Sequence, residues 1–183
     1  MSQEDRQRWD QKWSGLTGKP FVPHPMLATN KALLPGGRAL DLACGMGQNS
    51  IWLASHGYQV MGIDISGEAL RAALAQATQR DIADQIVFAQ MDLDLWSLPL
   101  QAFDLICVFR FLNRRLFPGI RTGLKSGGLL LYCTRHMGIL DRHPDAHQDY
   151  LLQPNELFNE FSDWRILHYA EGSDNAEIIA QKK

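Results

Sequence analysis

The chain has 183 residues, about one domain's worth, and its 45% hydrophobic and 21% charged residues are typical of an ordinary globular protein. Its 18 lysines and arginines are outnumbered by 20 aspartates and glutamates, so the net charge of -2 gives no cationic field to attract nucleic acid or an anionic membrane. Residues 2–13 are too polar for a secretory signal, and no later run approaches the roughly 18 apolar residues of a membrane span. The expected location is therefore the cytoplasm, and neither nucleic acid nor membrane is an expected partner.

Residues 1–34 are predicted to form a helix and an irregular lid, and residues 35–183 to form the core of a single domain. Trp9 and Trp13 are four residues apart and therefore share one face of the predicted helix. This face should dock the helix on the body of the protein, and its second predicted role is to cover a bound ligand.

Beyond residue 37, short apolar runs alternate with helical patterns, which predicts an α/β fold with a parallel sheet between layers of helices. Strands buried on both faces are continuously apolar, and five runs fit that description: 38–44, 58–65, 86–92, 103–110 and 128–135. Two further β-like runs should pair as a hairpin: 164–170 and 176–181.

Four helices are predicted between and after these strands: 48–56, 66–80, 114–125 and 154–161. Ser66 is the predicted N-cap of the second helix, and the third should be broken at Pro118-Gly119. The apolar face of the second helix should contain Leu70, Ala73, Leu74 and Ala77. The three cysteines lie in or beside predicted strands and are expected to be reduced core thiols: Cys44, Cys107 and Cys133.

The most specific pattern is an apolar strand that leads into a turn of small residues and then into a helix. Ala43, Gly45 and Gly47 would let a cofactor lie against bare backbone, and the first N–H groups of the following helix are unpaired. A dinucleotide-binding loop has the same architecture with the pattern Gly-x-Gly-x-x-Gly, but here Ser50 replaces the third glycine. Asp41, four residues before Gly45, would repel a pyrophosphate and attract a cationic ligand.

Asp41-x-x-x-Gly45-x-Gly47 resembles the first motif of class I S-adenosylmethionine-dependent methyltransferases, an acid followed by Gly-x-Gly-x-Gly, with Ala43 in place of the first glycine. The resemblance implies a Rossmann-like α/β fold with a seven-stranded, mostly parallel sheet whose last strand is antiparallel. It also implies S-adenosylmethionine as the cofactor, whose ammonium and sulfonium groups suit an acidic loop better than a pyrophosphate does. The cofactor-binding residues implied in this motif are Asp41, Ala43, Cys44, Gly45, Gly47 and Asn49.

Three later strand ends match the remaining motifs of this superfamily in order and spacing. The resemblance implies that Asp64 accepts hydrogen bonds from both ribose hydroxyls, which a carboxylate can do at once, and that Ile65 packs beside the adenine. Asp92 and Leu93 are the implied contacts to the adenine amino group and ring. At the fourth strand end, the residues implied to face the methionine part of the cofactor are Phe109 and Arg110.

The matches cover residues 34–135, and Ser126 departs from the usual proline of the superfamily's Leu-x-Pro-Gly-Gly turn into the fifth strand. Within the superfamily, three patterns resemble the small bacterial tellurite-resistance-type methyltransferases: Trp9-Asp10-x-x-Trp13, Gly47-x-Asn49-Ser50 and Leu152-x-x-x-Glu156-Leu157.

The implied reaction is direct displacement of the methyl group by a small-molecule acceptor, whose reacting atom is nitrogen, oxygen, sulfur or a heavier chalcogen. One alternative is an NAD(P)-dependent oxidoreductase, against which Asp41 and the missing third glycine argue. The other is a binding scaffold without catalysis, against which the complete cofactor motif argues.

No catalytic base is identified by the sequence, and Arg110 and His136 are the two candidates. The alternative for Arg110 is a solvated charge at a strand end. His136 begins a polar segment that also contains His143 and His147, but their spacing fits no standard metal site and Pro144 disturbs a helical pairing of the two. A metal ion is therefore not predicted, and the segment is expected to be a polar surface loop.

Overall fold

The computed structural model describes residues 3–14 and 21–183, and the chain divides into two compact units, residues 1–97 and 98–183. The seven strands have the order β3-β2-β1-β4-β5-β7-β6. All the pairs described are parallel except the two that β7 makes, which are antiparallel. This order confirms the predicted Rossmann-like fold with an antiparallel last strand. The single-domain organisation remains a prediction.

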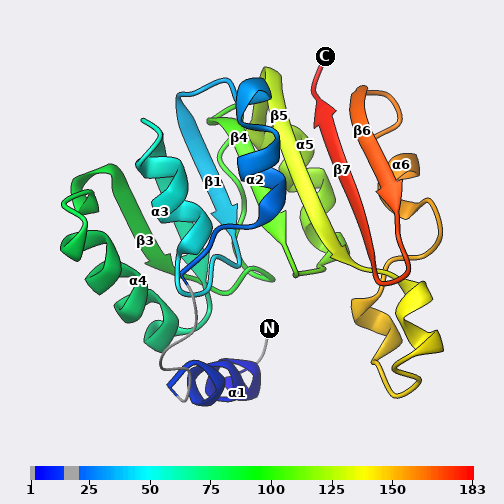
Figure 1. The fold of residues 1–183 in the computed structure, drawn as a ribbon, viewed down its shortest axis with the longest axis horizontal. Coiled ribbons are helices and arrows are strands. Elements are labelled where there is room, and N and C mark those ends of the chain that lie inside the picture. The colour runs from blue at the N-terminus through cyan, green and yellow to red at the C-terminus, as the bar shows by residue number, and fades with distance from the viewer. Residues whose placement is uncertain (1–2, 15–20) are drawn as a thin grey trace. The chain divides into compact units, whose positions relative to one another are not determined.

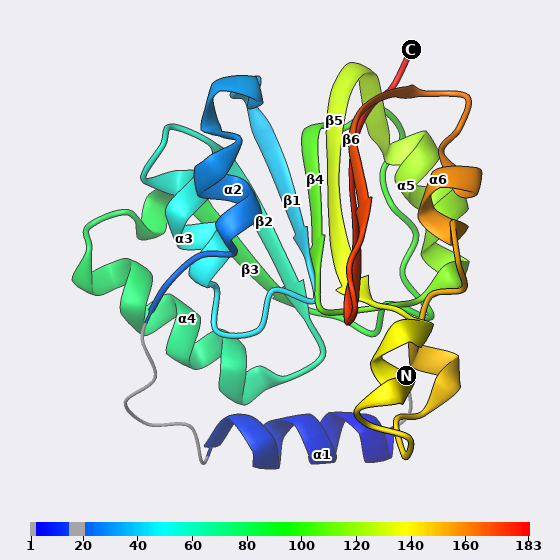
Figure 2. The ribbon, with the colours of Figure 1, turned by 45° about the vertical axis from the view of Figure 1, so that its right-hand side comes forward.

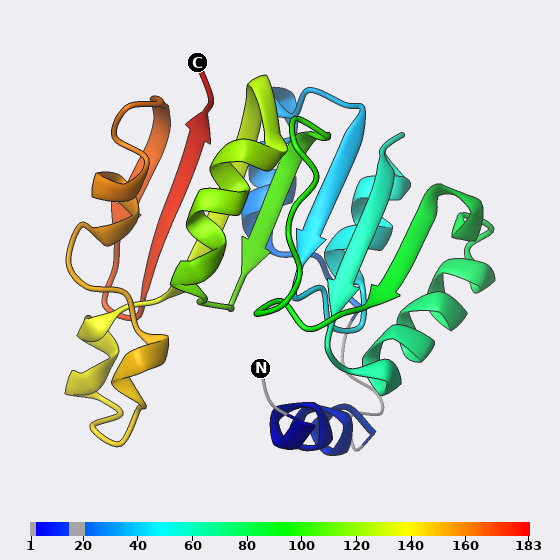
Figure 3. The same ribbon diagram turned by 180° about the vertical axis from the view of Figure 1, so that it is seen from behind.

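The first unit contains three parallel strands and the helices that pack on them (Figure 1). Its strands are β1 (Arg38–Leu42), β2 (Gln59–Asp64) and β3 (Ile86–Gln90). Its helices are α1 (Gln3–Ser14), α2 (Pro25–Thr29), α3 (Gln48–Ala54) and α4 (Gly67–Gln79), with short 3-10 turns at Lys31–Leu33 and Ala83–Gln85. The helix α1 lies beyond the carboxyl ends of the three strands in every view (Figures 1 and 3). Part of the predicted lid, residues 15–20, lies outside the described residues.

The start of α4 agrees with the prediction, because the Ser66 hydroxyl accepts a hydrogen bond from the Ala69 N–H at 3.2 Å and so caps the helix. The helix buries Leu70, Ala73 and Ala77, whereas Leu74 is 49% exposed. Leu74 was predicted on the buried face but lies at its margin.

The second unit contains the other four strands: β4 (Phe103–Phe109), β5 (Leu124–Arg135), β6 (Arg165–Glu171) and β7 (Asn175–Gln181). Its helices are α5 (Phe117–Gly123) and α6 (Glu156–Glu160), and its 3-10 turns are Arg114–Leu116, Met137–Asp141 and Gln148–Tyr150. The predicted hairpin is confirmed, with Ala170 opposite Glu177, and β7 also pairs with β5. Both helices lie on one face of β5, β6 and β7 (Figure 2). On that face the Phe117 ring packs edge-on against Tyr132 and Phe161, at centroid distances of 6.1 and 5.9 Å.

The predicted break at Pro118-Gly119 is wrong. The helix α5 begins at Phe117, so Pro118 falls in its first turn. The N–H groups of a first turn have no helical acceptor, so the N–H that proline lacks is not needed there. Gly119 and Gly123 lie on one side of α5, and a Cβ at either would lie about 3 Å from the side chain of Leu98. The glycines therefore let the chain before β4 cross close to the helix.

The three cysteines are buried and form no disulfide, as predicted for core thiols. Within residues 3–14 and 21–183, no helix combines the length and apolar character needed to cross a membrane.

Candidate functional site

The loop after β1 has an alternating backbone in which Ala43, Gly45 and Gly47 are left-handed, with φ of 55°, 54° and 75°. A Cβ at Gly47 would lie 2.9 Å from both Ala73 Cβ and a ring carbon of Phe88. Glycine is therefore required at this position by its backbone conformation and by the packing of α4 and β3. The neighbouring helix and strand therefore hold the loop rigidly in this conformation.

Asp64, at the end of β2, fastens this loop to the strand. One carboxylate oxygen accepts the Gly45 N–H at 2.8 Å and the other accepts the Ser66 N–H at 2.9 Å. The carboxylate is 7% exposed, and burial raises its pKa while the two backbone hydrogen bonds oppose that rise. Each oxygen keeps a second lone pair, so the group can still accept two hydrogen bonds from a vicinal diol.

Asp41 is almost completely buried, with 1% of its surface exposed, and its carboxylate accepts a hydrogen bond from the Ser50 hydroxyl at 2.7 Å. Burial raises the pKa of Asp41 to about 7, although the bonds to Ser50 oppose this rise. Ser50, which distinguishes the loop from a dinucleotide-binding pattern, is therefore the partner that stabilises the acid at the base of the loop.

The helix α1 contributes two contacts that the sequence analysis did not assign. Asp10 accepts hydrogen bonds from the Ser66 hydroxyl at 2.6 Å and from the Glu68 N–H at 3.2 Å, and the first of these lowers its pKa. A Cβ added at Gly45 would lie 3.0 Å from the ring of Trp13, so this indole covers the turn. The i, i+4 spacing of Trp9 and Trp13 predicted a docking face, and their rings stack with centroids 6.4 Å apart. The residue that the face covers was not predictable from that spacing.

The other predicted residues of the first unit surround the same strand ends. Asn49 accepts a hydrogen bond from the His24 N–H at 2.8 Å and so positions the chain before α2. Ile65 and Leu93 are buried, and the Asp92 carboxylate accepts the N–H of Asp94 at 2.8 Å. Gln90, which the sequence analysis missed, donates to the Ile65 carbonyl at 2.9 Å and joins the ends of β2 and β3.

In the second unit, Phe109 ends β4 as a buried residue and Arg110 follows it with an exposed side chain. Arg110 has a left-handed backbone, with φ of 57°, and its N–H donates to the Cys133 carbonyl at 2.8 Å. His136 follows β5, and its Nδ1 accepts the Gly138 N–H at 2.7 Å. That bond caps the turn Met137–Asp141.

Comparison with known proteins identifies the family. A family model described as a methyltransferase domain matches residues 39–128, which include β1–β4, α3, α4 and the glycine loop. The chain belongs to the class I S-adenosylmethionine-dependent methyltransferase superfamily.

Several individual methyltransferases are similar to it in sequence. The chain is 30% identical over 141 residues to a probable S-adenosyl-L-methionine-dependent methyltransferase, TehB of Haemophilus influenzae. The aligned segment covers 73% of this chain and 48% of that protein. It is 32% identical over 128 residues to probable thiol methyltransferase 2 of Arabidopsis thaliana, covering 66% and 54%. It is 33% identical over 105 residues to ribosomal RNA small subunit methyltransferase C of Alcanivorax borkumensis, covering 51% and 31%. The chain thus spans between a third and about half of the length of these relatives.

The crystal structure of Haemophilus influenzae TehB has the same fold, with a TM-score of 0.74, 19% sequence identity, and coverage of 97% of this chain and 67% of that one. The methyltransferase motif of this chain has Ala43 where the superfamily usually has glycine. Ala43 nevertheless adopts the left-handed backbone that a glycine there would favour.

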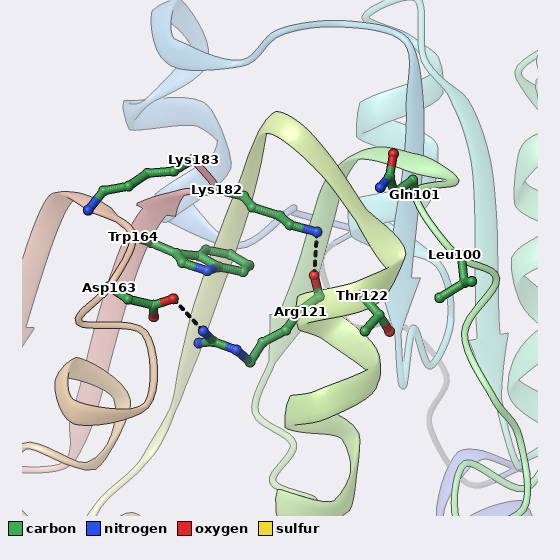
Figure 4. Close-up of a pocket in the computed structure, with 8 residues that line it drawn as sticks. All are labelled: Leu100, Gln101, Arg121, Thr122, Asp163, Trp164, Lys182 and Lys183. Atoms are coloured by element: carbon green, nitrogen blue, oxygen red, sulfur yellow. Dashed lines mark hydrogen bonds and ion pairs between the residues drawn. The ribbon is translucent and has the colours of Figure 1, made fainter.

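A hollow of about 440 Å³ lies elsewhere in the second unit, near the start of β4 and the end of β7 (Figure 4). Three of its charged groups already have partners, because Arg121 pairs with Asp163 and Lys182 donates to the carbonyls of Arg121 and Leu124. The hollow is not at the carboxyl ends of the parallel strands, where α/β folds bind ligands. Across the described part of the chain, no three His, Cys, Asp or Glu side chains are grouped to hold a metal ion.

Proposed function

We propose that the chain binds S-adenosylmethionine at the loop Asp41–Gly47 and at Asp64, and that it transfers the methyl group to a small molecule. The observation that carries the proposal is the combination of a loop of small, left-handed residues with Asp64, whose two oxygens fix the loop and retain lone pairs for a ribose diol. The superfamily membership supports the same reading.

The donor set of the loop fits this cofactor better than it fits a dinucleotide. The cofactor has cationic ammonium and sulfonium groups and no phosphate, and two acids, Asp41 and Asp64, lie at the loop. A pyrophosphate would meet both of them. This electrostatic difference favours methyl transfer over the alternative of hydride transfer with NAD(P).

The remaining roles follow the strand ends. Ile65 and Leu93 would supply apolar contacts to the adenine, and Asp92 would accept from its amino group. The protein would position the acceptor and exclude water, because the sulfonium already activates the methyl group. The acceptor lone pair would form the new bond to the methyl carbon, the methyl–sulfur bond would break, and S-adenosylhomocysteine would leave with that electron pair.

A small-molecule acceptor is proposed because the net charge of -2 gives no general attraction to a polynucleotide. The names of the relatives do not agree on an acceptor, since one specifies a thiol and another specifies ribosomal RNA. His136 does not suit the role of general base, since its Nδ1 accepts the Gly138 N–H and the neutral ring then carries its hydrogen on Nε2.

The test is calorimetric titration of the protein with S-adenosylmethionine, S-adenosylhomocysteine and NAD. The expected result is micromolar binding of the two sulfur compounds and none of NAD. Asp64→Ala should weaken S-adenosylhomocysteine binding by about 1–3 kcal/mol, because it removes the acceptor of the diol and one fastening of the loop. Asp84→Ala, at an exposed acid in the turn before β3, is the matched control and should bind like the wild type. Binding of NAD alone, or equal affinity in Asp64→Ala, contradicts the proposal.

A further inference from the structure

Two arginines stand at neighbouring strand ends of the second unit without an ion-pair partner among the described residues. Arg110 follows β4 and Arg135 ends β5, and both side chains are exposed. Three other arginines of the same unit are neutralised, because Arg114 pairs with Glu156, Arg121 with Asp163 and Arg142 with Asp174. The positive charge at the carboxyl ends of β4 and β5 therefore remains uncompensated.

The backbone of Arg110 is held in a conformation that an arginine does not favour. Its φ of 57° is left-handed, and the hydrogen bond from its N–H to the Cys133 carbonyl fixes it there at 2.8 Å. Left-handed non-glycine residues cluster at ligand sites, where the surrounding structure maintains them for the sake of side-chain direction. The conformation ends the strand and redirects the Arg110 side chain.

Arg135 is fixed by neighbours on both sides. It pairs with Asn175 across the β5–β7 ladder, and its carbonyl accepts the Leu152 N–H at 3.0 Å. Because Phe109 is in register with Cys133 on the adjacent parallel strand, Arg110 is level with the residue before Arg135. Arg135 is two residues after Cys133 and so shares its face of β5, and the Arg110 charge acts on the Cys133 thiol. Because neighbouring strands are about 4.8 Å apart, the two long side chains can reach a common ligand.

Two acids beside the end of β5 are already engaged. Asp174 binds Arg142, and Glu177 binds His168 at 2.8 Å. Burial raises the pKa of Cys133 to about 12, with Glu177 adding to the rise and Arg110 opposing it, so the Arg110 charge acts close to the end of β5. The local acids thus leave Arg110 and Arg135 available for an anion from outside the protein.

We propose that the methyl acceptor carries a carboxylate and that Arg110 and Arg135 together bind it. A guanidinium presents paired N–H donors that match the two oxygens of a carboxylate, so two of them fix both its position and its orientation. This inference rests on the proposed methyl transfer and adds to it the class of acceptor.

The test compares matched acids and amides as acceptors for methyl transfer from S-adenosylmethionine. The pairs are 3-mercaptopropionate and its amide, 4-hydroxybenzoate and its amide, and 4-aminobenzoate and its amide, which offer sulfur, oxygen and nitrogen. For the pair that reacts, kcat/KM should favour the acid about 10-fold or more, and Arg135→Gln should lower kcat/KM for the acid by about 10- to 100-fold, mainly through KM. The value for the amide should change less than about twofold.

The control is Arg165→Gln, which removes an exposed arginine at the start of β6. Arg165 is level with Leu129 in the ladders, six residues along β5 from Arg135, which is about 20 Å away. This variant should keep the preference for acids. Equal rates for acids and amides, or equal losses for both in Arg135→Gln, overturn the inference.

Titration with S-adenosylhomocysteine separates this inference from the proposed function. If the wild type does not bind S-adenosylhomocysteine, the proposed function fails. If it binds but its complex neither methylates nor binds any of the three carboxylates, the acceptor inference alone fails. Arg110→Gln should lose the acid preference, as Arg135→Gln does. An acid preference that survives in Arg110→Gln overturns the arginine pair.

Discussion

The glycine loop of the first unit and the strand ends of the second unit differ in how their polar groups are satisfied. In the loop, Asp64 and Asp41 already have hydrogen-bond partners inside the protein, and the backbone is packed so closely that a methyl group at Gly47 would collide with its neighbours. At the strand ends, Arg110 and Arg135 are fixed through their backbones but their charges are uncommitted. The packing of the loop therefore preorganises it for one ligand. The packing at the strand ends leaves two positive charges free for a ligand but does not fix the shape of that ligand.

Gly47→Ala tests how tightly the loop is packed and should have the largest effect. It should lower the free energy of unfolding by about 2–4 kcal/mol, because it adds left-handed strain to a collision with Ala73 and Phe88. The measurement is urea denaturation. Gly57→Ala is the control, since Gly57 has φ of 85° but nothing within 4 Å of the added Cβ. The control should lose only the backbone part, about 1–2 kcal/mol. Equal losses in the two variants would show that the loop is not tightly packed.

Asp41→Asn tests whether the buried carboxylate at the base of the loop lowers the free energy of unfolding when it is ionised. The folded pKa of about 7 is above the ordinary value of 3.8, so between these pH values the folded protein holds a proton that the unfolded chain has released. The contribution of Asp41 to the free energy of unfolding therefore falls as pH rises from about 4 to 7. Asparagine should remove this slope and make the variant more stable than the wild type by about 1–3 kcal/mol at pH 8.

The measurement for Asp41→Asn is urea denaturation between pH 5 and 8, with S-adenosylhomocysteine affinity measured in parallel and expected to fall. Asp163→Asn is the control, because the bond to Arg121 lowers the pKa of Asp163 and its titration lies below this window. A stability difference from the wild type that does not change with pH would refute the assignment for Asp41.

Ala43→Gly tests whether the left-handed backbone of Ala43 is strained, and it should have the smallest effect on the stability of the loop. Glycine relieves the left-handed strain at φ of 55° but adds freedom to the unfolded chain, so the expected net gain in the free energy of unfolding is about 0.5–1 kcal/mol. Thermal denaturation would detect it. A destabilised Ala43→Gly variant would mean that the Ala43 methyl group packs favourably.

At the strand ends, by contrast, Arg135→Gln should change the free energy of unfolding by less than about 0.5 kcal/mol, because the exposed side chain has no partner among the described residues to lose.

The sequence predicted the strands and the motif acids well because both depend on local patterns. The continuous apolar runs gave the strands to within a few residues, and Ser66 was identified as a cap from its place before α4. The pairing of Ser50 with Asp41 and the position of Trp13 over Gly45 depend on contacts between separated segments, which no local pattern contains. Pro118 was misjudged because its effect depends on whether it lies in the first turn of a helix or farther along.

The position of β7 between β5 and β6 has a consequence for synthesis on the ribosome. β6 lies at the edge of the sheet and has β7 as its neighbour, yet β7 is made after it. While the nascent chain grows, β6 has emerged before the strand that joins it to β5 is available, and its backbone groups must stay hydrated or find a temporary partner. The first unit, whose strands are all made earlier, can complete its own pairing during that interval. The two halves of the sheet are therefore expected to assemble in the order in which they are translated.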